Sequence, residues 1–235
     1  MKPNNLFKKD IYLIKDVHKY KHQDDPDIKF TSVTTFVENF FQGFDSIKIA
    51  NKLINNYAKY SNYTVESLLE EWEETAKYGT YVHEEIENWI RHETKPKEIK
   101  SINGINWLKN YKMKSNFEIY PEMIIYSKKL KIAGTIDVLA LDKNTKQYDL
   151  IDWKTSKKIE MSAYGGKVGT KAATNNIPDC NYYHYALQLS LYRYILEEFY
   201  GLAIRDQLIA HLRDDYARGI IMPYMRKEIK KMLDH

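Results

Sequence analysis

Apolar and polar residues in the middle of the chain follow the pattern of β-strands. Branched and aromatic side chains dominate the three segments concerned, which are residues 117–126, 131–141 and 147–153. The intervening Asp142-Lys-Asn-Thr145 has the composition of a turn, so the second and third strands are predicted to form a hairpin. Shorter strands are predicted over residues 11–14 and 206–212.

Apolar residues recur every three to four positions in much of the remaining chain, which predicts helices. The segment FTSVTTFVENFF starts a helix with Thr31 or Ser32 as its cap. Longer helices are predicted over residues 45–60, 64–92, 182–200 and 223–233. Residues 156–181 show neither pattern and are expected to form an irregular connection. This order of elements is typical of an α/β fold with a mixed central sheet flanked by helices.

The length of 235 residues suits a single domain, with a mainly helical N-terminal part over residues 1–110 and an α/β core over 111–235. Hydrophobic residues make up 43% of the chain, which is enough for a full core. The net charge of +4 is too small to indicate a polyanionic partner by itself. The 20 tyrosines accompany abundant Lys, Asn and Ile, a mixture that AT-rich coding also produces.

Cys180 is the single cysteine, so the chain cannot form an internal disulfide or hold a four-cysteine iron–sulfur cluster. The first residues, MKPNNLFKKD, lack the apolar segment of a secretory signal. No run approaches the roughly 20 apolar residues that a membrane helix needs. We therefore expect a soluble, intracellular protein without a membrane partner.

Three charged residues interrupt the predicted hairpin. Asp137 and Asp152 are acids within apolar strands, and a buried acid is costly unless something neutralises it. Lys154 shares a strand face with Asp152, because side chains repeat with period two, and Gly134 would let a ligand approach the backbone. Either acid alone could lie at an exposed strand end. Asp152 and Lys154 together could form only a salt bridge. Two converging carboxylates and an amine are also what a divalent cation and a phosphodiester require.

The residues of this hairpin resemble the signature of a known protein family. Gly134-Thr-Ile-Asp137 followed by Asp152-Trp-Lys-Thr155 resembles the signature of the PD-(D/E)XK nuclease superfamily, and in particular its RecB-like exonucleases. That branch adds a histidine on an upstream helix and a Gln-x-x-x-Tyr motif on a following helix. His83 in YGTYVHEEIENWI and Gln188 with Tyr192 in YALQLSLYRYIL match them. The chain is similar to mitochondrial genome maintenance exonucleases and viral relatives, which share the segment Ser32-Val-Thr34.

The resemblance implies a PD-(D/E)XK core and a metal-dependent active site. It implies that one or two Mg²⁺ or Mn²⁺ ions are held by His83, Asp137, Asp152, the Trp153 carbonyl and Glu122. Lys154 would orient the attacking water. Two of these positions have an alternative structural explanation: His83 would pair with Glu87 one turn along, and Glu122 would be an exposed strand acid.

The resemblance also implies contacts with DNA. Gln188 and Tyr192 would touch the DNA strand or brace Lys154, unless they form a packed helix face. Ser32 and Thr34 would contribute further contacts. The connection after the lysine motif carries Lys157, Lys158, Lys167 and Lys171, which would track phosphates or lie in a solvated loop.

We therefore expect a metal-dependent DNA nuclease, an exonuclease on single-stranded or frayed ends, that works in DNA repair or recombination beside replication or recombination proteins. The single cysteine fits the branch without an iron–sulfur cluster. Two alternatives are a structure-specific endonuclease of the same fold and a non-catalytic DNA-binding subunit.

Overall fold

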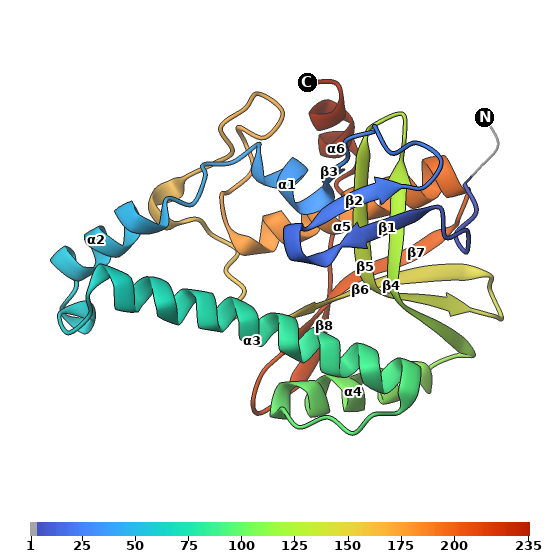
Figure 1. The fold of residues 1–235 in the computed structure, drawn as a ribbon, viewed down its shortest axis with the longest axis horizontal. Helices are drawn as coiled ribbons and strands as arrows, with labels where there is room; N and C mark the ends of the chain where they lie inside the picture. The colour runs from blue at the N-terminus through green and yellow to red at the C-terminus, as the bar shows by residue number, and fades with distance from the viewer. Residues whose placement is uncertain (1–3) are drawn as a thin grey trace.

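A mixed sheet runs through the centre of the structure, a computed structural model that describes residues 4–235 (Figure 1). Its strands follow the order β3-β5-β6-β7-β8, with β4 also paired to β5. The bounds are β3 Thr31–Ser32, β4 Phe117–Ser127, β5 Ile132–Asp142, β6 Gln147–Lys154, β7 Ile204–Leu212 and β8 Ala217–Ile221. The β3–β5 and β6–β7 pairs are parallel and the other pairs antiparallel, so the mixed α/β fold expected from the sequence is confirmed.

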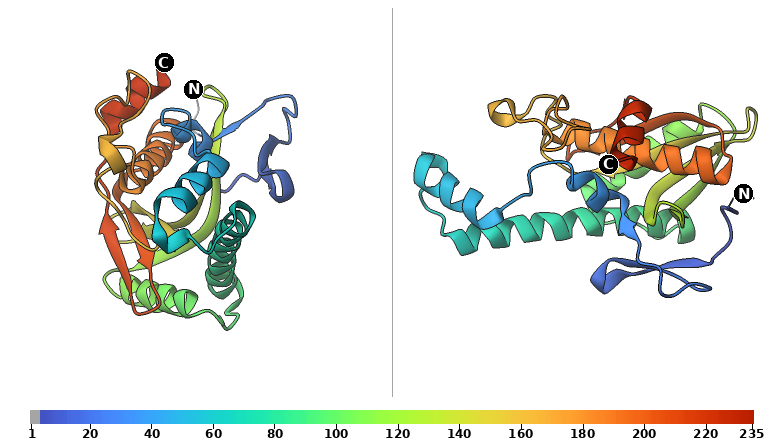
Figure 2. Two further views of the ribbon diagram at one scale, coloured as in Figure 1. Left: turned by 90° about the vertical axis from the view of Figure 1, so that its left-hand side faces the viewer. Right: turned by 90° about the horizontal axis from the view of Figure 1, so that it is seen from above.

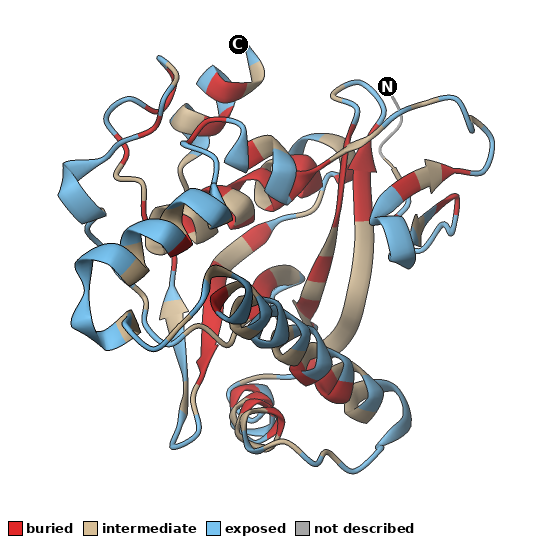
Figure 3. Ribbon diagram, turned by 60° about the vertical axis from the view of Figure 1, so that its left-hand side comes forward, coloured by how far each residue is buried: buried red, intermediate tan, exposed pale blue. Residues whose placement is uncertain are grey.

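Helices cover both faces of the sheet. On one face α1 (Val33–Glu38), α5 (Asn181–Tyr200) and α6 (Arg226–Leu233) pack against β5, β6 and β7. On the other face α3 (Val65–His92) and α4 (Ile99–Lys112) do so. Figure 3 shows the buried residues concentrated in the strands and on the inner sides of these helices. Apolar burial on the two faces therefore holds the strand ends in fixed positions.

An arm extends from this body. It consists of α2 (Ser46–Asn56) and the N-terminal half of α3, and Figure 2 shows both reaching beyond the sheet. The irregular segment 156–181 extends alongside them. The Tyr57 hydroxyl following α2 lies 3.2 Å from the Tyr164 hydroxyl of that segment, so the two meet at their outer ends.

A second, two-stranded sheet is formed by β1 (Ile11–Ile14) and β2 (Lys19–His22), which we call the N-terminal hairpin. Side-chain hydrogen bonds attach it to the central sheet. The Tyr126 hydroxyl donates to Asp10 Oδ2 at 2.9 Å, and the Tyr20 and Thr135 hydroxyls lie 3.0 Å apart. The turn of the hairpin is thereby held in front of β5.

The predicted strands and helices are present with boundaries shifted by a few residues. The capping residue of α1 is Ser32, whose hydroxyl accepts from the Thr35 N–H. The sequence did not reveal α4, because its apolar residues are not gathered on one face and small residues such as Ser101 and Gly104 are buried within it. It also missed β2 and β8, which are short and carry charged residues. Within residues 4–235, no helix has both the length and the apolar character needed to cross a bilayer.

Candidate active site

β6 presents its acid and its amine to the same side of the sheet. Nζ of Lys154 lies 2.6 Å from Oδ2 of Asp152, and the Asp152 residue is only 3% exposed. Alternating side chains of β6 pack in opposite cores, Leu150 toward α5 and Trp153 toward α3 and α4. The period of two therefore turns Asp152 and Lys154 toward α5, on the shared strand face that the sequence predicted.

Asp137 reaches the same place because the β4–β5 ladder is interrupted. The pairing passes from Pro121–Val138 to Met123–Ile136 and omits Glu122 and Asp137, where Glu122 has a φ of +50°. Ile136 packs toward α5 but Val138 toward α3 and α4, so the alternation of β5 changes phase at Asp137. Asp137 Oδ2 then accepts a 2.8 Å hydrogen bond from the Trp153 backbone N–H, which ties β5 to β6.

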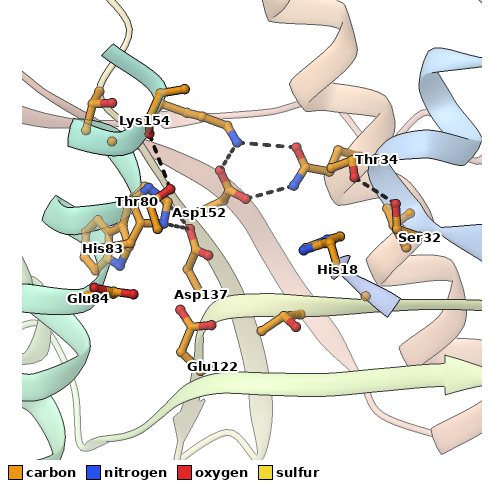
Figure 4. A pocket seen from close by; sticks show the side chains of 18 of the residues that line it. His18, Ser32, Thr34, Thr80, His83, Glu84, Glu122, Asp137, Asp152 and Lys154 are labelled. Carbon is orange, nitrogen blue, oxygen red and sulfur yellow. Dashed lines mark hydrogen bonds and ion pairs between the residues drawn. The ribbon is translucent and has the colours of Figure 1, made fainter. Parts of the chain in front are cut away.

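His83 joins this group from α3. Its Nδ1 lies 3.4 Å from Asp137 Oδ2, as drawn in Figure 4. Glu87, the alternative partner considered from the sequence, instead accepts a 2.7 Å bond from Arg91. α3 approaches the end of β6 closely at Gly79, where an added Cβ would lie 3.1 Å from Thr155 Oγ1. A small residue one turn before His83 therefore lets the histidine reach the sheet.

α5 supplies an amide that connects the acid and the amine. Gln188 Nε2 donates to Asp152 Oδ1 at 3.0 Å, and Gln188 Oε1 accepts from Lys154 Nζ at 3.4 Å. The Lys154 ammonium also lies 4.5 Å from the centre of the Tyr185 ring. Gln188 thus braces the lysine, one of the two roles considered for it.

Tyr192 is buried on the same helix face. A Cβ at Gly134 would lie 2.6 Å from Tyr192 Cε1, so the ring takes much of the room that we expected to be open to a ligand. Burial raises the pKa of the Tyr192 hydroxyl well above its usual value. The packed helix face considered from the sequence is therefore present, and Tyr192 also lines the cleft.

These side chains line one cleft of about 800 Å³. Ser32 and Thr34 lie in its wall, with their hydroxyls 3.0 Å apart, and Glu122 lies beside Asp137 (Figure 4). Several lining residues were not predicted as site residues: Lys15, His18 and Tyr20 of the N-terminal hairpin, Trp72 of α3 and Tyr185 of α5. The spacing of Tyr185, three residues before Gln188, could have indicated a shared helix face.

The four predicted loop lysines do not line the cleft. Lys157, Lys158 and Lys167 are exposed in the segment after β6. Lys171 is half-buried, with its ammonium 4.4 Å from the centre of the Phe40 ring. The segment therefore offers three solvated cations outside the cleft and one that packs against an aromatic residue.

The cleft holds more carboxylate than its cations neutralise. Burial, then the charges of Asp137 and Glu87, raise the pKa of Glu122 to about 8. Burial also raises the pKa of Asp152, against the opposing effect of Lys154. Burial opposes ionisation of Asp137 too, but His83 and Lys154 outweigh it and hold its pKa below the usual value.

The two basic groups respond to the same acids. Burial acts to lower the pKa of His83, but the Asp137 carboxylate outweighs it, and the pKa is raised. Burial likewise acts to lower the pKa of Lys154, and Asp152 and Asp137 raise it. The site therefore favours a charged ammonium at Lys154.

The kinds of donor in the cleft fit a divalent cation, since carboxylate oxygens suit Mg²⁺ and an added imidazole suits Mn²⁺. The raised pKa of Glu122 is a second feature, because a bound cation would favour the ionised form of this acid. Within residues 4–235, however, no three His, Cys, Asp or Glu side chains are gathered closely enough to form a metal site. Asp152 turns to Lys154 and Gln188 instead, and Asp137 turns to His83 and the Trp153 N–H.

Comparison with known proteins gives a partial similarity. No protein-family model matches the chain. Over 92 residues, 39% of its length, the chain is 30% identical to an ATP-dependent helicase/nuclease subunit from Carboxydothermus hydrogenoformans. The matched region covers 6% of that much longer protein. The similarity thus concerns one small part of a helicase/nuclease subunit.

Proposed function

We propose that this protein is a DNA nuclease of the PD-(D/E)XK superfamily, in the RecB-like exonuclease branch without an iron–sulfur cluster. Its substrate is single-stranded DNA or a frayed end, and its partners are replication or recombination proteins. The observation that carries the proposal is the meeting of Asp137, Asp152 and Lys154 in one cleft. The local similarity to a helicase/nuclease subunit supports the same class of activity.

The acids and the histidine are the groups that would hold one or two Mg²⁺ or Mn²⁺ ions. These groups are His83, Asp137, Asp152, the Trp153 carbonyl and Glu122. When bound, such an ion polarises a phosphoryl oxygen and lowers the pKa of a bound water. The Asp137 and Asp152 carboxylates pair with His83 and Lys154, so binding requires their oxygens to be shared or released.

Lys154 positions the attacking water or stabilises the charge that develops on the phosphate. Its ammonium is fixed by Asp152 and Gln188, and it donates hydrogen bonds to the attacking water or to the phosphoryl oxygen that becomes negative. Ser32, Thr34 and Tyr192 lie along the same cleft and are the groups that would contact the DNA strand. Each group thus acts from a position that a helix or strand holds in place.

Linear single-stranded oligonucleotides labelled at the 5′ or the 3′ end provide the test. The parent chain should release labelled mononucleotides or short products with Mg²⁺ or Mn²⁺, and none in EDTA. The Lys154→Ala variant is the matched control and should be inactive under all conditions. Undiminished cleavage in EDTA, or by this variant, would contradict the proposed active site.

A closed circular single strand tests the mode of cleavage. It has no ends, so an exonuclease should leave it intact while degrading the linear strand of the same sequence. Cutting of the circle would show an endonuclease, and a chain inactive on every DNA and RNA substrate would point to a binding subunit.

A further inference from the structure

The N-terminal hairpin contributes a lysine and a histidine to one wall of the cleft, which no motif in the sequence indicated. Lys15 is the first residue of the short 3₁₀ turn Lys15–Val17 between β1 and β2, and His18 follows the turn. Both line the cleft together with Asp137 and Asp152. Both residues are exposed. Figure 4 shows His18 on the side of the site away from His83, with Asp137 and Asp152 drawn between them.

The turn is held there by specific contacts. Tyr20 is 4% exposed, and its hydroxyl lies 3.0 Å from Thr135 Oγ1, two residues before Asp137. At the base of the hairpin, His22 and Asp10 are buried against Tyr126 of β4. The hairpin is therefore anchored at two levels and presents its turn to the cleft as a fixed surface.

The backbone of the turn is unusual at the residue that faces the site. His18 has a φ of +47° and a ψ of +49°, the left-handed conformation that residues other than glycine seldom adopt. Its N–H donates to the Lys15 carbonyl, which brings these two residues close together. Residues held in such conformations are common at sites that bind ligands.

The charge of this wall is opposite to that of the acids it faces. Lys15 lines the same cleft as Glu122, Asp137 and Asp152, so its ammonium and these carboxylates border one space. Lys154 stands on the sheet side of the same cleft. A nucleic-acid strand in the cleft would therefore meet cations from two walls.

We propose that Lys15 and His18 form a phosphate-binding subsite for an internal phosphodiester next to the one that is cleaved. The subsite rests on the proposed function, since it positions the strand that the acids and Lys154 act upon. Lys15 supplies a fixed positive charge, and the His18 imidazole supplies a ring N–H donor. Together they bind the strand and take no part in the bond-breaking step.

The test compares the parent, the Lys15→Gln, His18→Gln double variant and the control Lys19→Gln. Lys19 is an exposed lysine of the same hairpin that does not line the cleft. Binding of a fluorescein-labelled oligothymidylate is measured by anisotropy in EDTA at several salt concentrations, and cleavage is measured with Mg²⁺. Melting curves check that each variant is folded.

The double variant should bind with a salt slope flatter by about 0.7 for each phosphate interaction that the substitutions remove. Its KM should rise about tenfold with kcat within a factor of about two, because a strand contact that is equal in ground and transition states changes binding alone. The Lys19→Gln control should match the parent. Equal salt slopes and equal KM values in all three chains would overturn the subsite. Cleavage by the parent chain would still support the proposed function in that case.

Two further outcomes also count against the subsite. A loss of affinity confined to oligonucleotides with a terminal phosphate would overturn its assignment to an internal phosphodiester. A parent chain that neither binds nor cleaves nucleic acid would overturn both the subsite and the proposed function.

Discussion

The ring of Tyr192 occupies the space that a side chain at Gly134 would need. A Cβ on Gly134 would lie 2.6 Å from Tyr192 Cε1 and 3.0 Å from Val33 Cγ2. Tyr192 is 4% exposed and Val33 is fully buried, so neither can move freely into solvent. This contact fixes α5 against β5 at the level of the candidate site.

Gly134→Ala should therefore lower the free energy of unfolding by about 1–3 kcal/mol, the usual cost of overpacking a core. The second substitution Tyr192→Leu should recover part of this loss, because it removes the ring that clashes. Chemical denaturation of the two single variants and the double variant measures the coupling. Strictly additive losses would show that the ring is not what excludes a side chain at Gly134.

Asp152→Asn should separate the site's chemistry from its stability. Without metal, relief of repulsion from Asp137 offsets the lost pairing with Lys154, so the free energy of unfolding should change by less than about 1 kcal/mol. With Mg²⁺ or Mn²⁺ the parent's melting temperature should rise more than the variant's. Cleavage should fall at least about a hundredfold.

A structural ion pair would give the opposite pattern for Asp152→Asn. Leaving Lys154 buried and unpaired would then cost about 3–5 kcal/mol without metal, and activity would follow the folded fraction. Thermal unfolding with and without metal, measured beside initial cleavage rates, distinguishes the two patterns.

Tyr185 should position Lys154 through the face of its ring. The ammonium lies 4.5 Å from the ring centre, and such contacts contribute about 0.5–2 kcal/mol. Tyr185→Leu should therefore reduce kcat about threefold to thirtyfold, whereas Tyr185→Phe keeps the ring and should stay within about twofold of the parent. Equal losses in both variants would assign the effect to the hydroxyl instead.

Glu122 should make the metal-free protein less stable as the pH rises. Its pKa is about 8 in the folded protein against 4.5 when unperturbed, so between these values the folded state holds a proton that the unfolded state has lost. Stability conferred by that proton falls as the pH rises through this range.

Glu122→Gln should remove this pH dependence and raise the free energy of unfolding at pH 8 by at least about 1 kcal/mol, close to the value of one pKa unit. Urea denaturation across the pH range measures the effect. Glu70→Gln, at an exposed position of α3, is the control and should leave the pH profile of the parent unchanged. If the free energy of unfolding of Glu122→Gln varied with pH just as that of the parent does, the Glu122 carboxylate would be ionised at neutral pH in the folded protein.

The loop lysines should divide into two classes. Replacing Lys157, Lys158 and Lys167 with Gln should flatten the salt dependence of DNA binding if this exposed segment follows the strand beyond the cleft. Lys171→Gln should leave that slope unchanged, since its ammonium packs on the Phe40 ring. Anisotropy titrations at several salt concentrations measure both, and an unaltered slope in the triple variant would mean that the segment is merely solvated.

The amino-acid sequence determined the secondary structure around the site and the relation between Asp152 and Lys154. Both follow from local rules: strand and helix patterns depend on neighbouring residues, and the period of two places these side chains on one face. The sequence also placed Gln188 and Tyr192 on one face of a helix, where the structure has them.

Only the tertiary structure decided how the remaining groups meet. The phase change at Asp137 depends on a positive φ at Glu122 in the neighbouring strand, and periodicity along a single strand does not contain that information. The hairpin turn with Lys15 and His18 reaches the cleft because nearby side chains bond to Thr135 and Tyr126, which lie more than a hundred residues further along the chain. These side chains are Tyr20, Asp10 and His22. Such contacts arise from the packing of distant segments, so no local pattern of residues predicts them.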